Sequence, residues 1–183
     1  EGLRQLEVQV GATRSEWSGA QGETFVVSDG AAVLSERRLP GLVLDLARAT
    51  RGDGTQGDWM FLTSGDSLQI VLSADQPTVG GTATYQGWGR FPDESEVPWR
   101  DVTVRWTETR AFDKARRDVP ARWTLQAEGN EMTGNLEMRT AHIEAGEGAG
   151  PLLPVEALFE VAGTLRMGRA AYPLRGLVRH VQR

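Results

Sequence analysis

The residues best suited to proton transfer in this chain are its two histidines, because the ordinary pKa of imidazole lies near neutral pH. One of them, His180, ends the segment YPLRGLVRH, in which apolar residues alternate with basic ones. On a strand, Leu174, Gly176, Val178 and His180 share one face. If that face points into a closed sheet, His180 lies at an end of the interior and could donate to a ligand or act as acid or base. A structural or solvated histidine is the alternative interpretation.

The other histidine, His142, lies two residues before Glu144, so both side chains would share a strand face. Metal sites usually need three or four ligands, and the chain has no cysteine to supply them. We therefore expect neither a metal site nor any other cofactor. An ordinary polar strand end is the simpler interpretation of this pair.

No nucleophile motif identifies a catalytic residue. The pattern G-x-S-x-G is absent, and the lack of cysteine excludes thiolate catalysis. Besides His180, the weak candidates for polarising a substrate are Glu108 and Arg122, and the catalytic assignment stays open. Glu94 and Glu96 lie in a proline-flanked acidic loop and indicate a solvated lid more than an acid–base pair.

Aromatic residues give the strongest indication of a binding site. Six tryptophans are many for a chain of 183 residues. Trp88, Trp106 and Trp123 fall on three successive predicted strands, and Tyr85 lies close to the first of them. Large aromatic side chains inside a barrel either fill it or line a cavity, so both core filling and ligand binding stay open for these four residues.

The loop GDGTQG (residues 52–57) matches the glycine spacing of a dinucleotide-binding turn. That turn must be followed by a helix, whereas the next residues, DWMFL, are typical of a strand. A hairpin loop is the better interpretation, and the overlapping tripeptide RGD is best explained by chance.

Composition narrows the class of protein. Hydrophobic residues make up 39% and charged residues 25%, which is typical of an ordinary globular chain, and the length favours one domain over residues 1–183. The net charge is −5 and the basic residues are scattered, which disfavours a nucleic-acid partner. No apolar run is long enough for a membrane-spanning helix, so we expect a soluble protein. Cytoplasmic and exported mature forms both remain open, as does the oligomeric state.

Short segments of strict alternation between apolar and polar residues predict an all-β protein. Turn sequences such as Gly129-Asn130 join consecutive segments as hairpins. The only helical signal is a single turn at 112–116, which Pro120 would end. The predicted strands are 3–10, 23–28, 31–38, 41–49, 58–64, 66–73, 78–89, 100–110, 120–128, 131–142, 155–168 and 171–182.

Consecutive hairpins on short turns predict an antiparallel up-and-down sheet, which avoids exposed edges by closing into a barrel. The segment with His180 would then be the closing strand. Alternating strand direction places the loops 51–57, 74–77, 111–119 and 145–154 at one end, and the turns 64–66, 129–130 and 168–170 with the loop 90–99 at the other. The end with more long loops is the expected mouth of the barrel.

The C-terminal half resembles the second module of the lipocalin-like (calycin) proteins grouped with AttH and the carotenoid 1,2-hydratases. The resemblance covers about a third of the chain, in the stretches PARWTL (120–125), GNLEM (134–138), EALFEVAGT (156–164) and YPLRGLVRH (172–180). This chain departs from the family pattern at Glu156, which lacks the preceding tryptophan, and at Arg179-His180, where a glutamate is usual. The resemblance implies a lipocalin-like barrel and an apolar small-molecule ligand, and it extends to barrel cyclases that fold polyene substrates.

Three functions remain open at this stage. The first is binding of a small, largely apolar molecule in the barrel. The second is a cofactor-free cyclase, isomerase or hydratase acting on a lipophilic substrate in the same place. The third is a structural module whose interior is filled.

Overall fold

The computed structural model describes residues 6–19, 22–34, 37–48, 57–65, 68–74, 78, 80–127 and 131–183. It divides into two compact units, Glu1–Asp53 and Gly54–Arg183. The described residues are strands and their connections and contain no helix, so none that could cross a membrane is found among them.

The first unit is a three-stranded antiparallel sheet in the order β1-β2-β3, with β1 at Leu6–Ser18, β2 at Glu23–Leu34 and β3 at Arg37–Arg48. The sequence predicted a break near Gly30, between strands 23–28 and 31–38, but β2 runs through this position. Gly30 instead allows close packing, since an added Cβ would meet the Gln9 carbonyl oxygen and the Val43 side chain. Here glycine marks a close approach of strands and not a turn.

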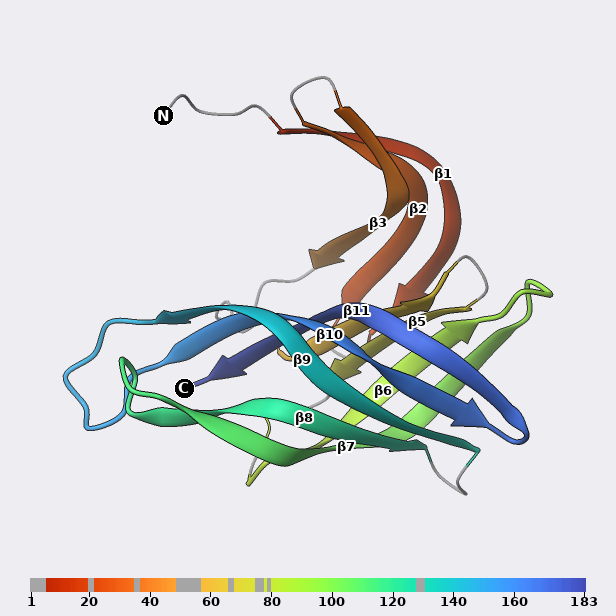
Figure 1. Cartoon of the computed structure of the whole chain (residues 1–183). Coiled ribbons are helices and arrows are strands. Elements are labelled where there is room, and N and C mark those ends of the chain that lie inside the picture. The colour runs from red at the N-terminus through yellow and green to blue at the C-terminus, as the bar shows by residue number, and fades with distance from the viewer. Residues whose placement is uncertain are drawn as a thin grey trace. The chain divides into compact units, whose positions relative to one another are not determined.

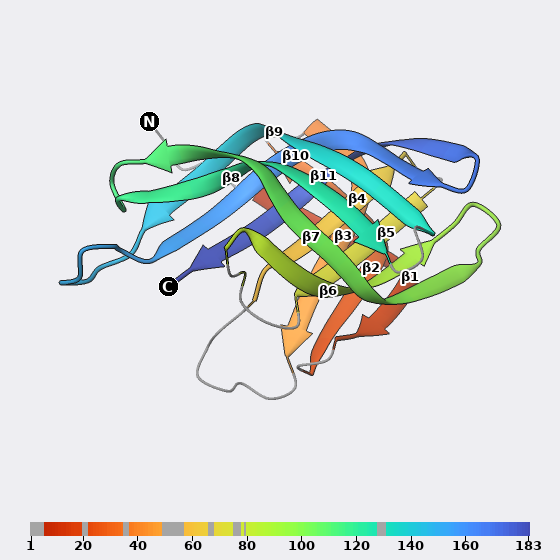
Figure 2. The ribbon, with the colours of Figure 1, turned by 90° about the horizontal axis from the view of Figure 1, so that it is seen from below.

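The second unit is a closed barrel of eight antiparallel strands, which confirms the predicted all-β, up-and-down barrel. Each strand pairs with its neighbour in sequence, and β11 pairs with β4 to close the ring, as expected for the last strand (Figures 1 and 2). The strands are β4 (Trp59–Ser64), β5 (Leu68–Ala74), β6 (Thr82–Arg90), β7 (Glu96–Phe112), β8 (Arg117–Ala127), β9 (Met132–Ala145), β10 (Val155–Met167) and β11 (Ala170–Gln182).

The barrel therefore uses only the part of the chain after residue 53, whereas the sequence predicted one barrel domain over 1–183. The expectation that residues 1–183 form a single domain stays a prediction. The strands β1–β3 are not members of the closed barrel.

Alternating burial along the strands defines the barrel interior. In β8, for example, Trp123, Leu125 and Ala127 are buried, while the residue before each of them is exposed: Arg122, Thr124 and Gln126. Each large apolar side chain buried in this way contributes about 1.5–3 kcal/mol to folding. The buried core side chains come from all eight strands and include Met60, Leu62, Leu72, Tyr85, Val104, Trp123, Leu136, Phe159, Leu165 and Val178.

The closing seam between β11 and β4 depends on Gly176. Gly176 pairs with Leu62, and an added Cβ would overlap the Phe61 carbonyl oxygen and approach the Leu62 Cα. The backbones approach too closely here for any side chain, which matches the structural role expected of this glycine.

The predicted helical turn at 112–116 is wrong. Residues 113–116 form a tight turn between β7 and β8, in which Arg116 has a φ of 56° and its N–H donates to the Asp113 carbonyl. Pro120 does not end a helix but lies within β8, opposite Thr109. The loop expected at 90–99 is also shorter, because β7 already begins at Glu96.

Candidate functional site

A buried Asp–His pair lies where β4 and β11 close the barrel. Arg179 pairs with Trp59 in the β11–β4 register, so Asp58, the residue before β4, comes to lie beside His180. His180 Nδ1 lies 2.8 Å from Asp58 Oδ2, and the N–H of Val181 donates to Asp58 Oδ1 at 2.8 Å. Asp58 is 4% exposed and His180 only 1%, so the pair is shielded from solvent.

Two further hydroxyl groups complete the surroundings of the Asp58 carboxylate. Thr78, in the connection between β5 and β6, donates to Asp58 Oδ2 at 3.0 Å. The hydroxyl of Tyr85, on β6, lies beside Thr78 and donates to the Asp58 carboxylate. Burial first, and the charge of Asp58 second, raise the pKa of the Tyr85 hydroxyl well above its ordinary value, which keeps it protonated as a donor.

The other ring nitrogen of His180, Nε2, is buried and has no hydrogen-bond partner among the residues that the structure describes. The imidazole packs edge-on against Trp106 of β7, with ring centroids 4.9 Å apart and an angle of 87° between the planes. A buried polar atom without a partner costs free energy unless a water molecule or a ligand group satisfies it. Within the described part of the chain, Nε2 is therefore the atom of this pair that lacks a hydrogen bond.

The arrangement supports proton transfer better than nucleophilic catalysis. In a serine or threonine hydrolase, the nucleophile's hydroxyl bonds to the histidine nitrogen that faces away from the aspartate. Here the nearby hydroxyl, that of Thr78, bonds to Asp58 instead. Asp58 can orient the imidazole and hold its proton on Nδ1, which leaves Nε2 to exchange a proton with a bound molecule.

The structure brings three of the four predicted ligand-binding residues into the interior. Tyr85 and Trp123 are buried, and Trp106 pairs with Trp123 across β7 and β8. Trp123 also meets Phe159 of β10 edge-on, with centroids 5.5 Å apart. Trp106 thus contacts His180 and Trp123 contacts Phe159, and the role of these rings in ligand binding stays a prediction.

Trp88, the fourth predicted residue, lies on the other face of β6. The burial of β6 alternates regularly, with Tyr85, Gly87 and Gly89 on the buried face and Trp88 on the less buried one. Trp88 therefore faces away from the interior. Its proximity to Tyr85 in the sequence gave no information about which face it occupies.

Two of the weak catalytic candidates, Glu108 and Arg122, meet each other but lie outside the barrel. Arg122 forms ion pairs with Glu108 at 3.2 Å and with Glu137 at 3.3 Å, and about half of each side chain is exposed. The β7–β8 register shifts on both sides of Glu108, so this residue does not share the face of Trp106. Only His180, of the three candidates, lies in the interior.

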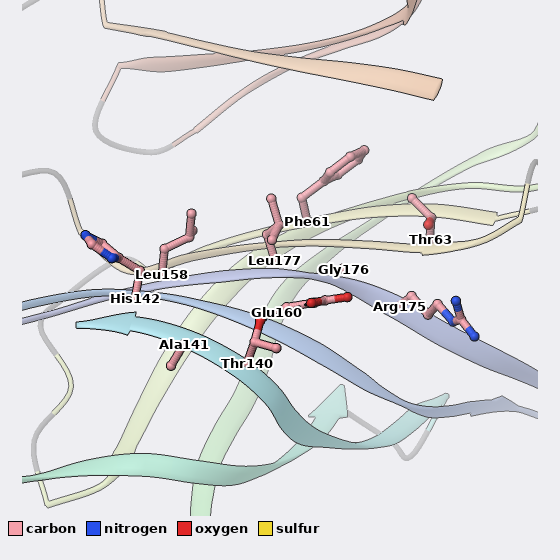
Figure 3. A pocket seen from close by; sticks show the side chains of 10 residues that line it. All are labelled: Phe61, Thr63, Thr140, Ala141, His142, Leu158, Glu160, Arg175, Gly176 and Leu177. Atoms are coloured by element: carbon pink, nitrogen blue, oxygen red, sulfur yellow. Dashed lines mark hydrogen bonds between the residues drawn. The ribbon is translucent and has the colours of Figure 1, made fainter. Parts of the chain in front are cut away.

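The outer face of β4, β9, β10 and β11 carries an open hollow of about 590 Å³, shown in Figure 3. Three of its polar side chains bond to protein groups: Thr140 donates to Glu160 at 3.0 Å, and the exposed His142 pairs with Glu144 at 3.0 Å. The hollow is lined by Phe61, Thr63, Thr140, Ala141, His142, Leu158, Glu160, Arg175, Gly176 and Leu177.

One barrel end is covered by the β7–β8 turn and the loop 146–154. The Leu153 N–H donates to the Ala115 carbonyl at 3.1 Å, and Arg117 donates to the Leu153 and Arg183 carbonyls at 2.6 and 2.7 Å. Ala115 is fully buried as a result. Asp58, Thr78 and His180 all lie toward this end, which is the end predicted as the mouth.

Several predicted features lie partly or wholly outside the described residues. The loop 52–57 is described only at Gly57, and residues 75–77 are not described. Within the described part of the chain, no three histidine, aspartate or glutamate side chains gather as a metal site would require.

Sequence reasoning identified His180 but missed Asp58 and Thr78. Asp58 is 122 residues away from His180 in the chain and stands at the start of a strand without any motif around it. One signal in the sequence could have indicated Asp58. It is an acidic residue directly before β4, the strand that pairs with the closing strand β11.

Comparison with known proteins adds information on the fold. No family model and no curated protein matches the sequence. Among solved structures, the chain is similar to kievitone hydratase from Nectria haematococca, with a TM-score of 0.56 and 14% sequence identity. The match covers 91% of this chain and spans 55% of that one. It fits a lipocalin-like fold, whereas the narrower resemblance to the AttH and carotenoid hydratase group stays a prediction.

Proposed function

We propose that the barrel binds a small, largely apolar molecule whose polar group hydrogen-bonds to His180 Nε2. The observation that carries this proposal is the buried Nε2 atom without a partner, beside Asp58 and the aromatic ring of Trp106. Ligand sites are generally apolar with a few polar groups that fix the orientation of the ligand. A ligand group at Nε2 would satisfy this atom, and the aromatic and aliphatic side chains would hold the rest of the molecule.

Intrinsic fluorescence tests this proposal, because Trp106 contacts the imidazole. The protein is titrated with a panel of lipophilic molecules that includes fatty acids, retinoids, steroids and polyphenols. We expect a saturable fluorescence change for at least one class, which shrinks in Trp106→Phe. The variant His180→Gln should bind the same molecule about tenfold more weakly, as one hydrogen bond is lost.

His142→Gln is the matched control, since His142 is exposed and paired with Glu144 on the outer face. It should bind like the unmodified protein. No saturable change with any member of the panel would overturn the proposed function.

A second candidate function is a cofactor-free hydratase or isomerase that uses His180 to move a proton. The specific support is Asp58, which holds the Nδ1 side of the ring and leaves Nε2 to react. The fold neighbour is a kievitone hydratase, which makes addition of water a reaction to test first. The runner-up reactions are isomerisation and cyclisation of a polyene-like substrate, for which a shaped apolar interior positions the reacting atoms.

Mass spectrometry separates this enzyme from a simple binding protein. Each ligand found by titration is incubated with the protein in D₂O and examined for added water or for exchanged deuterium. An enzyme should lose at least about a hundredfold of its rate in His180→Gln, the usual loss for a general acid or base. Unchanged ligand mass after long incubation would leave binding as the function.

A further inference from the structure

The proton on His180 decides which kind of ligand group the site can accept. Asp58 Oδ2 lies 2.8 Å from His180 Nδ1, so Nδ1 carries the proton that this hydrogen bond needs. In the neutral imidazole the other nitrogen, Nε2, then has no proton and can only accept a hydrogen bond. A ligand group that pairs with it must be a donor.

The surroundings of the pair supply Asp58 with hydrogen bonds that do not depend on a charged imidazole. Besides His180, the Asp58 carboxylate accepts hydrogen bonds from the Val181 N–H and from the hydroxyls of Thr78 and Tyr85. These three neutral donors stabilise the carboxylate without a second buried charge, which would cost desolvation free energy. The resting Asp–His pair of serine hydrolases is likewise a carboxylate with a neutral imidazole.

Among the residues that the structure describes, no other charged group is found to face His180 from the elements packed against it. On β10 its partner is Ala157, on β7 it meets Trp106, and on β6 the nearest titratable group is the protonated Tyr85. Its neighbour Arg179 bonds to the exposed Glu156. Within this described part of the chain, Asp58 is the group that sets the proton position on His180.

Resting on the proposed binding function, we propose that the ligand carries a hydroxyl, an enol or a phenol, which donates a hydrogen bond to His180 Nε2. The proton stays on the ligand oxygen, so no further charge is buried beside the Asp58 carboxylate. A ketone or an ether offers no donor and leaves Nε2 unpartnered, so such a molecule binds more weakly. The rings of Trp106, next to His180, and of Trp123 and Phe159 suit a flat ring system attached to that hydroxyl.

A matched pair of probes tests this choice: 2-naphthol and its methyl ether, which differ only in the hydroxyl proton. We expect the protein to bind the naphthol about tenfold more tightly than the ether, as for one additional hydrogen bond. In His180→Gln this preference should disappear.

Asp58→Asn gives a second, opposite readout. The asparagine amide can donate to Nδ1, which moves the ring proton to Nε2, as in the asparagine variant of the serine hydrolase pair. Nε2 then donates, and the preference should fall or reverse in favour of the ether. Circular dichroism confirms that both variants are folded, and His142→Gln should keep the original preference.

Equal affinities for naphthol and ether in the unmodified protein would overturn the inference while leaving the proposed binding function intact. A preference that survives unchanged in Asp58→Asn would overturn it as well. If neither compound binds, both the inference and the site at His180 for aromatic ligands are overturned.

Discussion

At the residue scale, the molecule is defined by one buried carboxylate and the groups that bond to it. Asp58 accepts from the Val181 N–H, the Thr78 hydroxyl, the Tyr85 hydroxyl and His180 Nδ1. A charge can be buried in an apolar interior only when it is hydrogen-bonded in this way. The same bonds fix the orientation of His180, so structural stability and the proposed function depend on the same contacts.

Removal of the carboxylate should therefore be costly. We expect Asp58→Ala to lower the free energy of unfolding by about 3–5 kcal/mol, because several buried donors lose their acceptor at once. Urea denaturation measures this change. His142→Gln, at the exposed histidine, should stay within about 0.5 kcal/mol of the unmodified protein. A loss below about 1 kcal/mol for Asp58→Ala would show that the carboxylate is not the centre of a buried network.

The raised pKa of Tyr85 predicts a dependence of stability on alkaline pH. The folded state keeps the Tyr85 proton above the ordinary pKa of tyrosine, whereas the unfolded chain releases it. The stabilisation is thus fully present below pH ~10 and is lost as the pH rises above that value. Unfolding free energies measured from pH 8 to 11 should fall more steeply for the unmodified protein than for Tyr85→Phe. Parallel profiles would contradict the buried, protonated Tyr85.

At the element scale, the closing pair of strands positions the site. The β4–β11 register places Asp58 beside His180, and Gly176 allows the two backbones to approach closely enough to keep that register. The site therefore forms only when the barrel is closed.

Gly176→Ala should disturb this closure. The new methyl group would overlap the Phe61 carbonyl, and backbone atoms cannot move aside as a flexible side chain can. We expect a loss of about 1–3 kcal/mol in thermal or urea unfolding, together with a weakened His180 site. Gly148→Ala is the control, since its added methyl group would make only ordinary contacts. Equal stability of the two variants would contradict the tight seam.

The covered end of the barrel gives a prediction about ligand access. Arg117 joins the start of β8 to the Leu153 and Arg183 carbonyls, next to the end where the Asp58–His180 pair lies. Arg117→Ala should increase hydrogen exchange in residues 146–154 and raise both association and dissociation rates of a bound ligand. Arg139→Ala, on the exposed face of β9, should change neither. Unchanged exchange and rates in Arg117→Ala would place ligand entry elsewhere.

At the scale of the whole molecule, the sequence predicted the fold class better than the site. Period-two alternation and hairpin turns are local signals, and they predicted the up-and-down barrel and its closing strand. The division into a three-stranded sheet and a barrel was not predicted, because β1–β3 show the same alternation as the barrel strands. Asp58 was missed because its role depends on a register between strands far apart in the chain. Glu108 was proposed because of its residue type, but the shifted β7–β8 register separates it from the face of Trp106.

The most direct test of the central claim is a ¹⁵N NMR spectrum of the imidazole groups, which is simple because the chain has only two histidines. We expect His180 to carry its proton on Nδ1 and to leave Nε2 bare, because Nδ1 bonds to Asp58. A saturating ligand should shift the Nε2 signal of His180 and leave that of the exposed His142 in place. Two results together would contradict the assignment of His180 as the ligand's partner. The His180 signals would show the exchanging tautomers of a solvated imidazole, and no ligand that the barrel binds would shift them.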